Sequence, residues 1–470
     1  MMTFLEKALG FDSKSMKLRT EIIAGATTFL TMSYILAVNP SILASTGMDK
    51  GALFTGTALA SAIATLLLAF MAKLPFAQAP SMGLNAFFAY TLCVSLGFTW
   101  QQSLAIMLIE GVLFIAITFF NVREMILNAI PTNLRYAISA GIGMFIAFIG
   151  LKNANIIVNN DATLVGLGAF TPTCILGIIA ILLSGALMAR NVKGSLFWGI
   201  IITTIIGIPM GVTVFPNGWL PVSAPQDITP IFCKFDFSGL LNLKTVLVIF
   251  SLLLINIFDT IGTLMGLADK TGIVEPNGNI PHVKEAMMSD AIGTTCGAML
   301  GSSTLTTYVE SASGIAEGGR SGVTAFTVGI FFIVSLFLSP IFLLIPSAAT
   351  SGALVMVGVL MIDSVKKINL QDITESFPAF ITMITMVLCY SIADGICLGI
   401  IAYVFMKTFT RQWKDLNCTL LCVYLYNLHL CIVSVLIIHV FVSIYILLCI
   451  NAILIRYYYL HVSKTLFTCK

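Results

Sequence analysis

Long apolar segments separated by short polar turns follow one another along most of this chain. A helix that crosses a membrane needs about 20 apolar residues, with a range near 17 to 25. Fourteen segments satisfy or approach this length: 20–43, 52–72, 80–97, 102–122, 135–152, 172–189, 195–213, 245–267, 286–300, 310–318, 321–344, 346–361, 375–390 and 392–409. We therefore predict an all-α, polytopic membrane protein with fourteen transmembrane segments.

Two of these segments, the third and the tenth, are short and interrupted. Residues 75–90 contain two prolines and several small residues, and residues 302–320 begin with hydroxyl and β-branched side chains and continue from Glu310 with small residues. Each stretch predicts a short extended piece followed by a short helix. Non-helical backbone at membrane depth is tolerated only where protein buries it or water reaches it. Interrupted segments at matching places in two halves of a chain are typical of a transporter's binding site.

The basic residues indicate the topology. With a cytoplasmic N-terminus, the inside segments carry 17 Lys and Arg and the outside segments carry four, so both ends of the fourteen-span unit are expected in the cytoplasm. Seven is odd, so a second set of seven spans would be inverted relative to the first. The expected division is an amphipathic lead at 1–19, a first seven-span repeat at 20–213, an extracytoplasmic loop at 214–244, a second repeat at 245–412 and an atypical tail at 413–470.

Composition narrows the functional classes. The chain is 58% hydrophobic and 10% charged, whereas a soluble protein has about 25% charged residues. Its basic residues are scattered between apolar segments, so the net charge of +3 does not indicate nucleic-acid binding. The 11 cysteines show neither CxxC nor Cys/His metal spacing. We expect a protein of the cell membrane, in contact with the lipid bilayer, without a metal or cofactor.

Two acidic residues, Asp259 and Glu310, lie within apolar segments and have no Lys or Arg close in sequence to pair with them. A buried carboxylate without a partner is costly, and an ionisable residue inside a membrane marks a functional site by default. Both are therefore candidates for substrate binding and for proton coupling, with a structural role as the weaker alternative. Glu317 and Arg320, farther along, are expected to form a surface ion pair.

Two amides complete the candidate site. Asn85 lies in the half-helix of the third segment, and its two donors and two acceptor lone pairs suit the edge of a heterocycle; interhelical bonding is the alternative. Asn256 lies one helical turn before Asp259, on the same side, where it would contact substrate or orient the carboxylate. Further candidates for lining the site are Tyr34, Gln78, Phe87 and Thr307. Packing is the better explanation for any single phenylalanine.

Several stretches resemble one family. They are GLNAFFAY at 83–90, FDTIGT at 258–263, TTYVESASGI at 306–315 and the opening stretch at 21–40. Together they resemble the adenine/guanine/hypoxanthine permeases, a branch of the xanthine/uracil permease superfamily of nucleobase–cation symporters. The resemblance covers roughly residues 3–417.

This resemblance implies two inverted seven-span repeats, in which spans 1–4 and 8–11 form a core that carries substrate and slides, elevator-like, against a gate of spans 5–7 and 12–14. It implies purine uptake coupled to protons. It places Asn85, Asp259 and Glu310 at the substrate positions of the family. Many relatives have an acid where this chain has Asn256, which bears on the preferred purine and on coupling. A homodimer is one oligomeric state that we consider.

Other functions remain to be weighed. A uracil or xanthine permease is the nearest alternative, and an anion transporter on the same plan is another. Two carboxylates argue against anions, because an anion site uses helix N-termini, Arg or Lys. The chain has no HExxH motif and no convincing Ser–Lys or paired-Asp arrangement. We therefore expect a transporter and not an enzyme.

The end of the chain differs from the rest. No glycine occurs after Gly399, although the chain has 37 glycines in all. A frameshifted reading of the end of the gene is the explanation we favour. An additional span over 430–454 is the alternative, because that stretch is apolar enough to cross a membrane.

Overall fold

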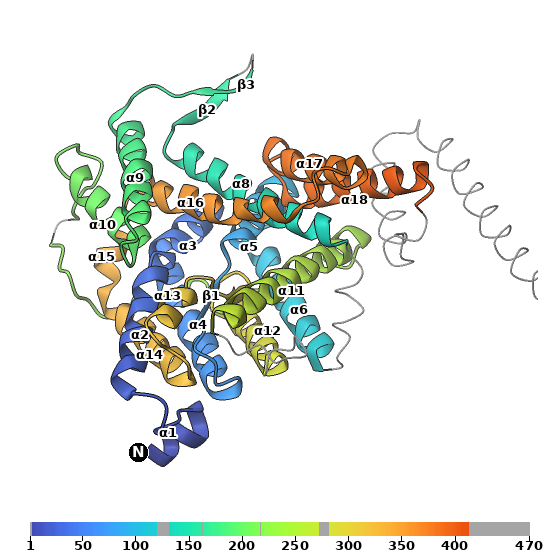
Figure 1. Cartoon of the computed structure of the whole chain (residues 1–470). Coiled ribbons are helices and arrows are strands. Elements are labelled where there is room, and N and C mark those ends of the chain that lie inside the picture. Colours follow the sequence, from blue (N-terminus) through green and yellow to red (C-terminus); the bar gives the residue numbers. More distant parts are fainter. Residues whose placement is uncertain (1, 120–130, 161–162, 217, 272–281, 413–470) are drawn as a thin grey trace, which may run out of the picture.

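The structure is a computed structural model that describes residues 2–119, 131–160, 163–216, 218–271 and 282–412. The atypical tail at 413–470, with its predicted frameshift or extra span, lies outside the described residues. Within the described part, helices account for most of the chain (Figure 1). Seven helical segments there are long and apolar enough to cross a membrane: Leu18–Thr46, Lys50–Met71, Trp100–Phe119, Thr132–Asn153, Pro172–Ala189, Gly322–Leu343 and Ser347–Lys367. The prediction of a helical, multi-pass membrane protein is confirmed.

The elements up to residue 207 are α1 (Met2–Leu9), α2 (Leu18–Met32), α3 (Ile35–Leu43), η1 (Ala44–Thr46), α4 (Lys50–Met71), β1 (Gln78–Pro80), α5 (Met82–Ala86), the π-helix η2 (Phe87–Ser95), α6 (Trp100–Phe119), α8 (Thr132–Asn153), β2 (Ile157–Asn160), β3 (Leu164–Leu167), α9 (Pro172–Ala189) and α10 (Ser195–Gly207). The later elements are α11 (Leu243–Thr271), α12 (Val283–Met299), β4 (Leu305–Thr307), α13 (Ser311–Ala316), α14 (Gly322–Ser335), η3 (Leu336–Leu338), α15 (Ser339–Leu343), α16 (Ser347–Ile362), η4 (Asp363–Lys367), α17 (Ile373–Leu388) and α18 (Ile392–Phe409).

Polar residues at the segment boundaries define where several helices begin. Asp49 precedes α4 and accepts a hydrogen bond from the backbone N–H of Ala52 at 2.7 Å. Thr171 caps α9 in the same way, and Pro172 occupies its first turn, where the missing N–H of proline costs nothing. Ser391 caps α18. These caps satisfy backbone donors that have no partner within the helix itself.

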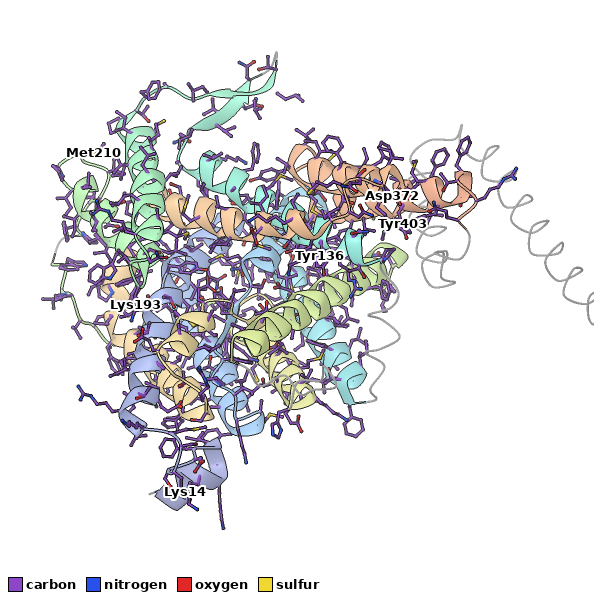
Figure 2. All side chains as sticks on the ribbon, viewed as in Figure 1. Lys14, Tyr136, Lys193, Met210, Asp372 and Tyr403 are labelled. Atoms are coloured by element: carbon purple, nitrogen blue, oxygen red, sulfur yellow. The ribbon has the colours of Figure 1, made fainter. Side chains whose placement is uncertain are left out.

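The helices pack in two groups, and each group draws on both halves of the chain. Helices α2 to α6 pack with α11 to α14, whereas α8, α9 and α10 pack with α16, α17 and α18. Figure 1 shows α8, α16, α17 and α18 above the group that contains α4, α12 and α14. Figure 2 places Lys14 at the lower end of the first group and Asp372 and Tyr403 in the second group.

Small residues allow the second group to pack closely. A Cβ added at Gly143 on α8 would lie 2.6 Å from the Cβ of Met361 and 2.9 Å from the carbonyl oxygen of Gly358 on α16. Gly352, also on α16, lies against the backbone of Ala180 on α9. Because helices within a membrane gain little from the hydrophobic effect, such close backbone contacts supply much of their packing energy.

Two short strands cross in the first group. Strands β1 and β4 pair antiparallel, with Gln78 opposite Thr307 and Pro80 opposite Leu305. Both strands are buried along their whole length, and each leads into a short helix, α5 or α13. A buried strand must satisfy its backbone polar groups. The two strands do so in part by pairing with each other and in part through the hydroxyls of Thr65 and Thr294, which bond the backbone of Gln78 and Leu305.

Some elements differ from the expected segments. The segment 20–43 divides into α2 and α3 at Ser33 and Tyr34, and the segment 321–344 divides into α14, η3 and α15. Proline 340 lies in the first turn of α15, and proline cannot continue a preceding helix because it lacks an N–H. Strands β2 and β3 pair antiparallel in the connection between α8 and α9.

Candidate functional site

The strand crossing lies next to the first candidate carboxylate. Asp259, on α11, accepts a hydrogen bond at Oδ2 from the hydroxyl of Ser81 at 3.0 Å. Ser81 directly follows β1, and its backbone N–H donates to the carbonyl oxygen of Thr304 at 3.0 Å. Asp259 as a residue is half-buried. The acid of α11 is thereby held where both interrupted segments meet.

The second candidate carboxylate begins the short helix on the other side of the crossing. Glu310 immediately precedes α13 and accepts a hydrogen bond at Oε1 from the hydroxyl of Tyr34 at 2.7 Å. Tyr34 is 1% exposed and lies at the break between α2 and α3. The break in the first span thus serves to bring a phenol against Glu310, which is itself half-buried. Asp259 and Glu310 form no ion pair within the part of the chain that the structure describes.

Asn85 presents a donor without a partner. It lies in α5 and is fully buried, and its Oδ1 accepts a hydrogen bond from the hydroxyl of Ser303. Its Nδ2 has no hydrogen-bond partner among the described residues. An unsatisfied buried donor costs about 1–3 kcal/mol, so this group is suited to an acceptor atom of a ligand.

Asn256 presents an acceptor without a partner. It is fully buried on α11, and its Nδ2 donates to Oε1 of Glu110 on α6 at 2.8 Å. Its Oδ1 has no partner within the described ranges. The predicted contact with Asp259 is therefore not among its hydrogen bonds; the partner is an acid on another helix. The site offers one buried donor, from Asn85, and one buried acceptor, from Asn256.

Three further candidates have other partners. Gln78 donates from Nε2 to the hydroxyl of Ser289 at 2.9 Å and to the carboxylate of Asp290. Thr307 donates to Oδ1 of the same Asp290 at 3.2 Å. These side chains bind the paired strands to α12, and their hydrogen bonds do not run to Asp259 or Glu310. Phe87 is fully buried in the hydrophobic core at the start of η2.

The sequence comparison identifies the family of the chain. A family model described as a permease family, the xanthine/uracil permeases, matches residues 19–398. The chain belongs to this permease family. The adenine permease AdeP of Escherichia coli (strain K12) is 42% identical over 414 residues, which cover 88% of this chain and 92% of AdeP. The guanine/hypoxanthine permease PbuO of Bacillus subtilis (strain 168) is 40% identical over 406 residues, which cover 85% and 94%. These relatives are named as transporters, so the predicted resemblance to the purine-permease branch is confirmed.

The fold of this permease also occurs in a more distant transporter. The transmembrane domain of a cyanobacterial bicarbonate transporter, BicA, superposes with a TM-score of 0.61 at 13% sequence identity, over 82% of this chain and 97% of that domain. At this identity the likeness concerns the fold alone.

Two acids of the permease that sequence reasoning overlooked are fully buried. Glu110 lies within α6 and Asp290 within α12. Both occupy apolar segments, so the rule that singled out Asp259 and Glu310 applied to them equally. Nothing in the sequence near either acid indicates its partner, because Asn256 lies 146 residues from Glu110 and Gln78 lies 212 residues from Asp290.

The expected surface pair of Glu317 and Arg320 is wrong. Glu317 pairs with Lys193, which Figure 2 labels near α10. The guanidinium of Arg320 instead donates to the backbone carbonyls of Ile315 and Gly319, both at 2.7 Å. Arg320 thus adds a donor to a carbonyl in the last turn of α13 and to one in the turn that follows the helix.

Proposed function

We propose that this permease imports purine nucleobases (adenine, hypoxanthine or guanine) together with protons. The observation that carries the proposal is a buried donor and a buried acceptor, each without a partner, on elements that also position or carry the two half-buried carboxylates. Asn85 Nδ2 and Asn256 Oδ1 have no partners among the described groups. A purine is flat and neutral and presents both donors and acceptors along its edges, so it complements such a set.

The carboxylates have separate roles in this proposal. Oε1 of Glu310 is taken by Tyr34, and we assign Oε2 to an N–H of the base. Asp259 accepts only from hydroxyl groups within the described residues, and it contacts the base or carries the proton. A carboxylate inside a membrane and without a cation is costly in its charged form. Protonation relieves that cost, which supports exchange of a proton during transport.

The architecture is proposed to be fourteen spans in two inverted repeats, at 20–213 and 245–412, with the N-terminus in the cytoplasm. Three features support it: each half contributes one strand followed by a short helix, the strands pair antiparallel, and each helix group contains elements of both halves. In this proposal the group of α2 to α6 and α11 to α14 carries the substrate and slides, elevator-like, against the group of α8 to α10 and α16 to α18.

Uptake of radiolabelled adenine, hypoxanthine, guanine, xanthine and uracil by cells that lack their own purine permeases tests the proposal. We expect uptake of at least one of the first three, and a protonophore should abolish its accumulation. Uptake of xanthine or uracil alone would instead indicate a xanthine or uracil permease. Uptake of radiolabelled bicarbonate or sulfate in the absence of purine uptake would favour an anion transporter.

The matched variants are Glu310→Gln and Glu317→Gln. Both remove one negative charge from the same short segment, but Glu317 is tied to Lys193. Losing a charge-assisted hydrogen bond costs about 1.5–3 kcal/mol, so Glu310→Gln should lower purine uptake at least about tenfold. Glu317→Gln, at equal abundance in the membrane, should transport nearly as well as the wild type. Equal uptake by the two variants would contradict the assignment of Glu310.

A further inference from the structure

Glu110 is a buried acid to which the proposed transport mechanism gives no role. It lies in the middle of α6, fully buried, with apolar residues before and after it. Its Oε1 accepts from Nδ2 of Asn256 at 2.8 Å, and its Oε2 accepts from the hydroxyl of Thr304 at 3.3 Å. No Lys, Arg or His forms an ion pair with it in the described part of the chain. A carboxyl group at this place is costly in a membrane, and an apolar residue would fit the pattern of the helix.

We propose that Glu110 is a positioning residue that fixes the orientation of the Asn256 amide and so determines which edge of a purine the site accepts. This inference rests on the proposed function. In this proposal Glu110 does not touch the substrate, but it determines which hydrogen-bonding group Asn256 presents to the substrate.

The argument begins with the chemistry of the amide. Asparagine carries a donor, Nδ2, and an acceptor, Oδ1, on opposite sides of one plane, so a rotation of about 180° exchanges the two. An ionised carboxylate only accepts hydrogen bonds. Nδ2 of Asn256 lies 2.8 Å from Oε1 of Glu110, and the hydroxyl of Thr304 lies 3.3 Å from Oε2 and 3.1 Å from Sδ of Met107. Against an ionised Glu110, Nδ2 of Asn256 faces the carboxylate, as the structure has it, because the opposite orientation would set two acceptors against each other.

The consequence is that Oδ1 of Asn256 faces away from Glu110 as a buried acceptor without a partner. A base that donates an N–H to Oδ1 satisfies it, whereas a base that presents a lone pair there leaves two acceptors in contact. Sites that hydrogen-bond one functional group discriminate strongly against analogues that lack it, because their buried polar groups are then left unpaired. Adenine, with its 6-amino group and unprotonated N1, and hypoxanthine, with its 6-oxo group and N1–H, present opposite patterns on this edge.

Thr304 connects this cluster to the strand crossing. Its hydroxyl donates to Glu110, and its backbone carbonyl accepts from Ser81, whose hydroxyl in turn holds Asp259. Glu110 is thus part of a hydrogen-bonded chain that reaches the candidate proton carrier. A change at Glu110 is expected to act on the orientation of Asn256 first, because that bond is shorter than the bond to Thr304.

The test compares inhibition constants of adenine and hypoxanthine against uptake of one radiolabelled purine. In the wild type the two constants should differ by at least about tenfold, the cost of one unmatched buried hydrogen bond. Glu110→Gln introduces an amide that can donate or accept, so Asn256 can take either orientation. The ratio of the two constants should then move toward one, while the maximal rate changes less than the KM values.

A second variant distinguishes positioning from a merely structural role. Asn256→Asp alone sets two carboxylates 2.8 Å apart, which repel each other, and uptake should fall sharply. Combining Asn256→Asp with Glu110→Gln lets the new glutamine donate to the new carboxylate, whose other oxygen again faces the site as an acceptor. The double variant should recover both the uptake lost in Asn256→Asp and the wild-type selectivity ratio.

Ser103→Ala is the matched control on α6. Ser103 is also fully buried, but its hydroxyl contacts Cys93 and the carbonyl of Thr99. Its selectivity ratio should equal that of the wild type. A wild-type ratio near one, an unchanged ratio in Glu110→Gln, or a double variant no better than Asn256→Asp would each overturn the role of Glu110 while purine transport itself stood. Absence of purine uptake by the wild type would overturn the proposed function and this inference with it.

Discussion

Replacement of Tyr34 by phenylalanine isolates one hydrogen bond at the heart of the candidate site. The phenol donates to Oε1 of Glu310 at 2.7 Å, across 276 residues of chain. Tyr34 is only 1% exposed, and phenylalanine keeps the ring, so Tyr34→Phe removes the donor without opening a large cavity. The variant therefore reports on the orientation of the Glu310 carboxylate and not on packing.

The expected size of the effect follows from the chemistry of the bond. A hydrogen bond to a charged group contributes about 1.5–3 kcal/mol, and 1.36 kcal/mol corresponds to a factor of ten. If the bond serves to aim Glu310 at the base, its loss should raise the KM for purine uptake by about 10- to 150-fold. The maximal rate should change less, because the ring and the break between α2 and α3 are retained.

The assay is the concentration dependence of initial purine uptake, corrected for the amount of protein in the membrane. Tyr136→Phe is the control. Tyr136, labelled in Figure 2, lies on α8, and its ring centroid lies 5.6 Å from the ammonium group of Lys367, so the same hydroxyl is removed in the other helix group. We expect its KM to match the wild type. A KM for Tyr34→Phe within about threefold of the wild type, a difference below 1 kcal/mol, would refute the role of this bond in orienting Glu310.

Three more variants follow from the same contacts. Asn85→Asp replaces the unpartnered donor Nδ2 with an acceptor, so competition assays should show at least about tenfold weaker purine binding, and unchanged binding would count against the Asn85 assignment. Gly314→Val would push a side chain into a threonine hydroxyl and a backbone carbonyl of α2. It should lower the free energy of unfolding by about 1–3 kcal/mol, measured as a lower melting temperature in detergent. In the control Gly185→Ala the nearest atom is 3.6 Å from the added Cβ, so this variant should melt like the wild type. Lys407→Met breaks the buried ion pair with Glu375 at 2.7 Å and should lower the free energy of unfolding by about 3–5 kcal/mol, because it leaves a buried charge unpaired. Adding Glu375→Leu removes that charge and should restore most of the loss. A double variant as unstable as Lys407→Met would contradict this explanation.

The sequence predicted the interrupted segments because their local chemistry is unusual. Prolines around β1 and hydroxyl and β-branched residues around β4 cannot form a lipid-facing helix, so the break was visible without a structure. Asp259 and Glu310 were found for a similar reason, since an acid in an apolar segment needs an explanation. Local patterns of this kind depend on neighbours in the chain, and a single sequence contains them in full.

The partners of these residues could not be predicted, because they lie far away in the chain. Tyr34 reaches Glu310 across 276 residues, and Gln78 reaches Asp290 across 212. No periodicity relates residues at such separations; only the packing of α2, α6 and α12 around the paired strands brings them together. Glu110 could have been noticed from the sequence, because it too is an acid within an apolar segment. Its partner, Asn256, lies on another helix and could not have been predicted.

In the proposed mechanism, the carboxylates at the strand crossing couple purine movement to proton movement. The most direct measurement is purine accumulation in proteoliposomes under an imposed inward proton gradient, for the wild type, Asp259→Asn, Glu310→Gln and the control Glu317→Gln. We predict that the wild type and Glu317→Gln concentrate purine above its external level until a protonophore is added. Glu310→Gln should fail to accumulate purine, and Asp259→Asn should at most equilibrate it. Accumulation against the gradient by both site variants would contradict the account.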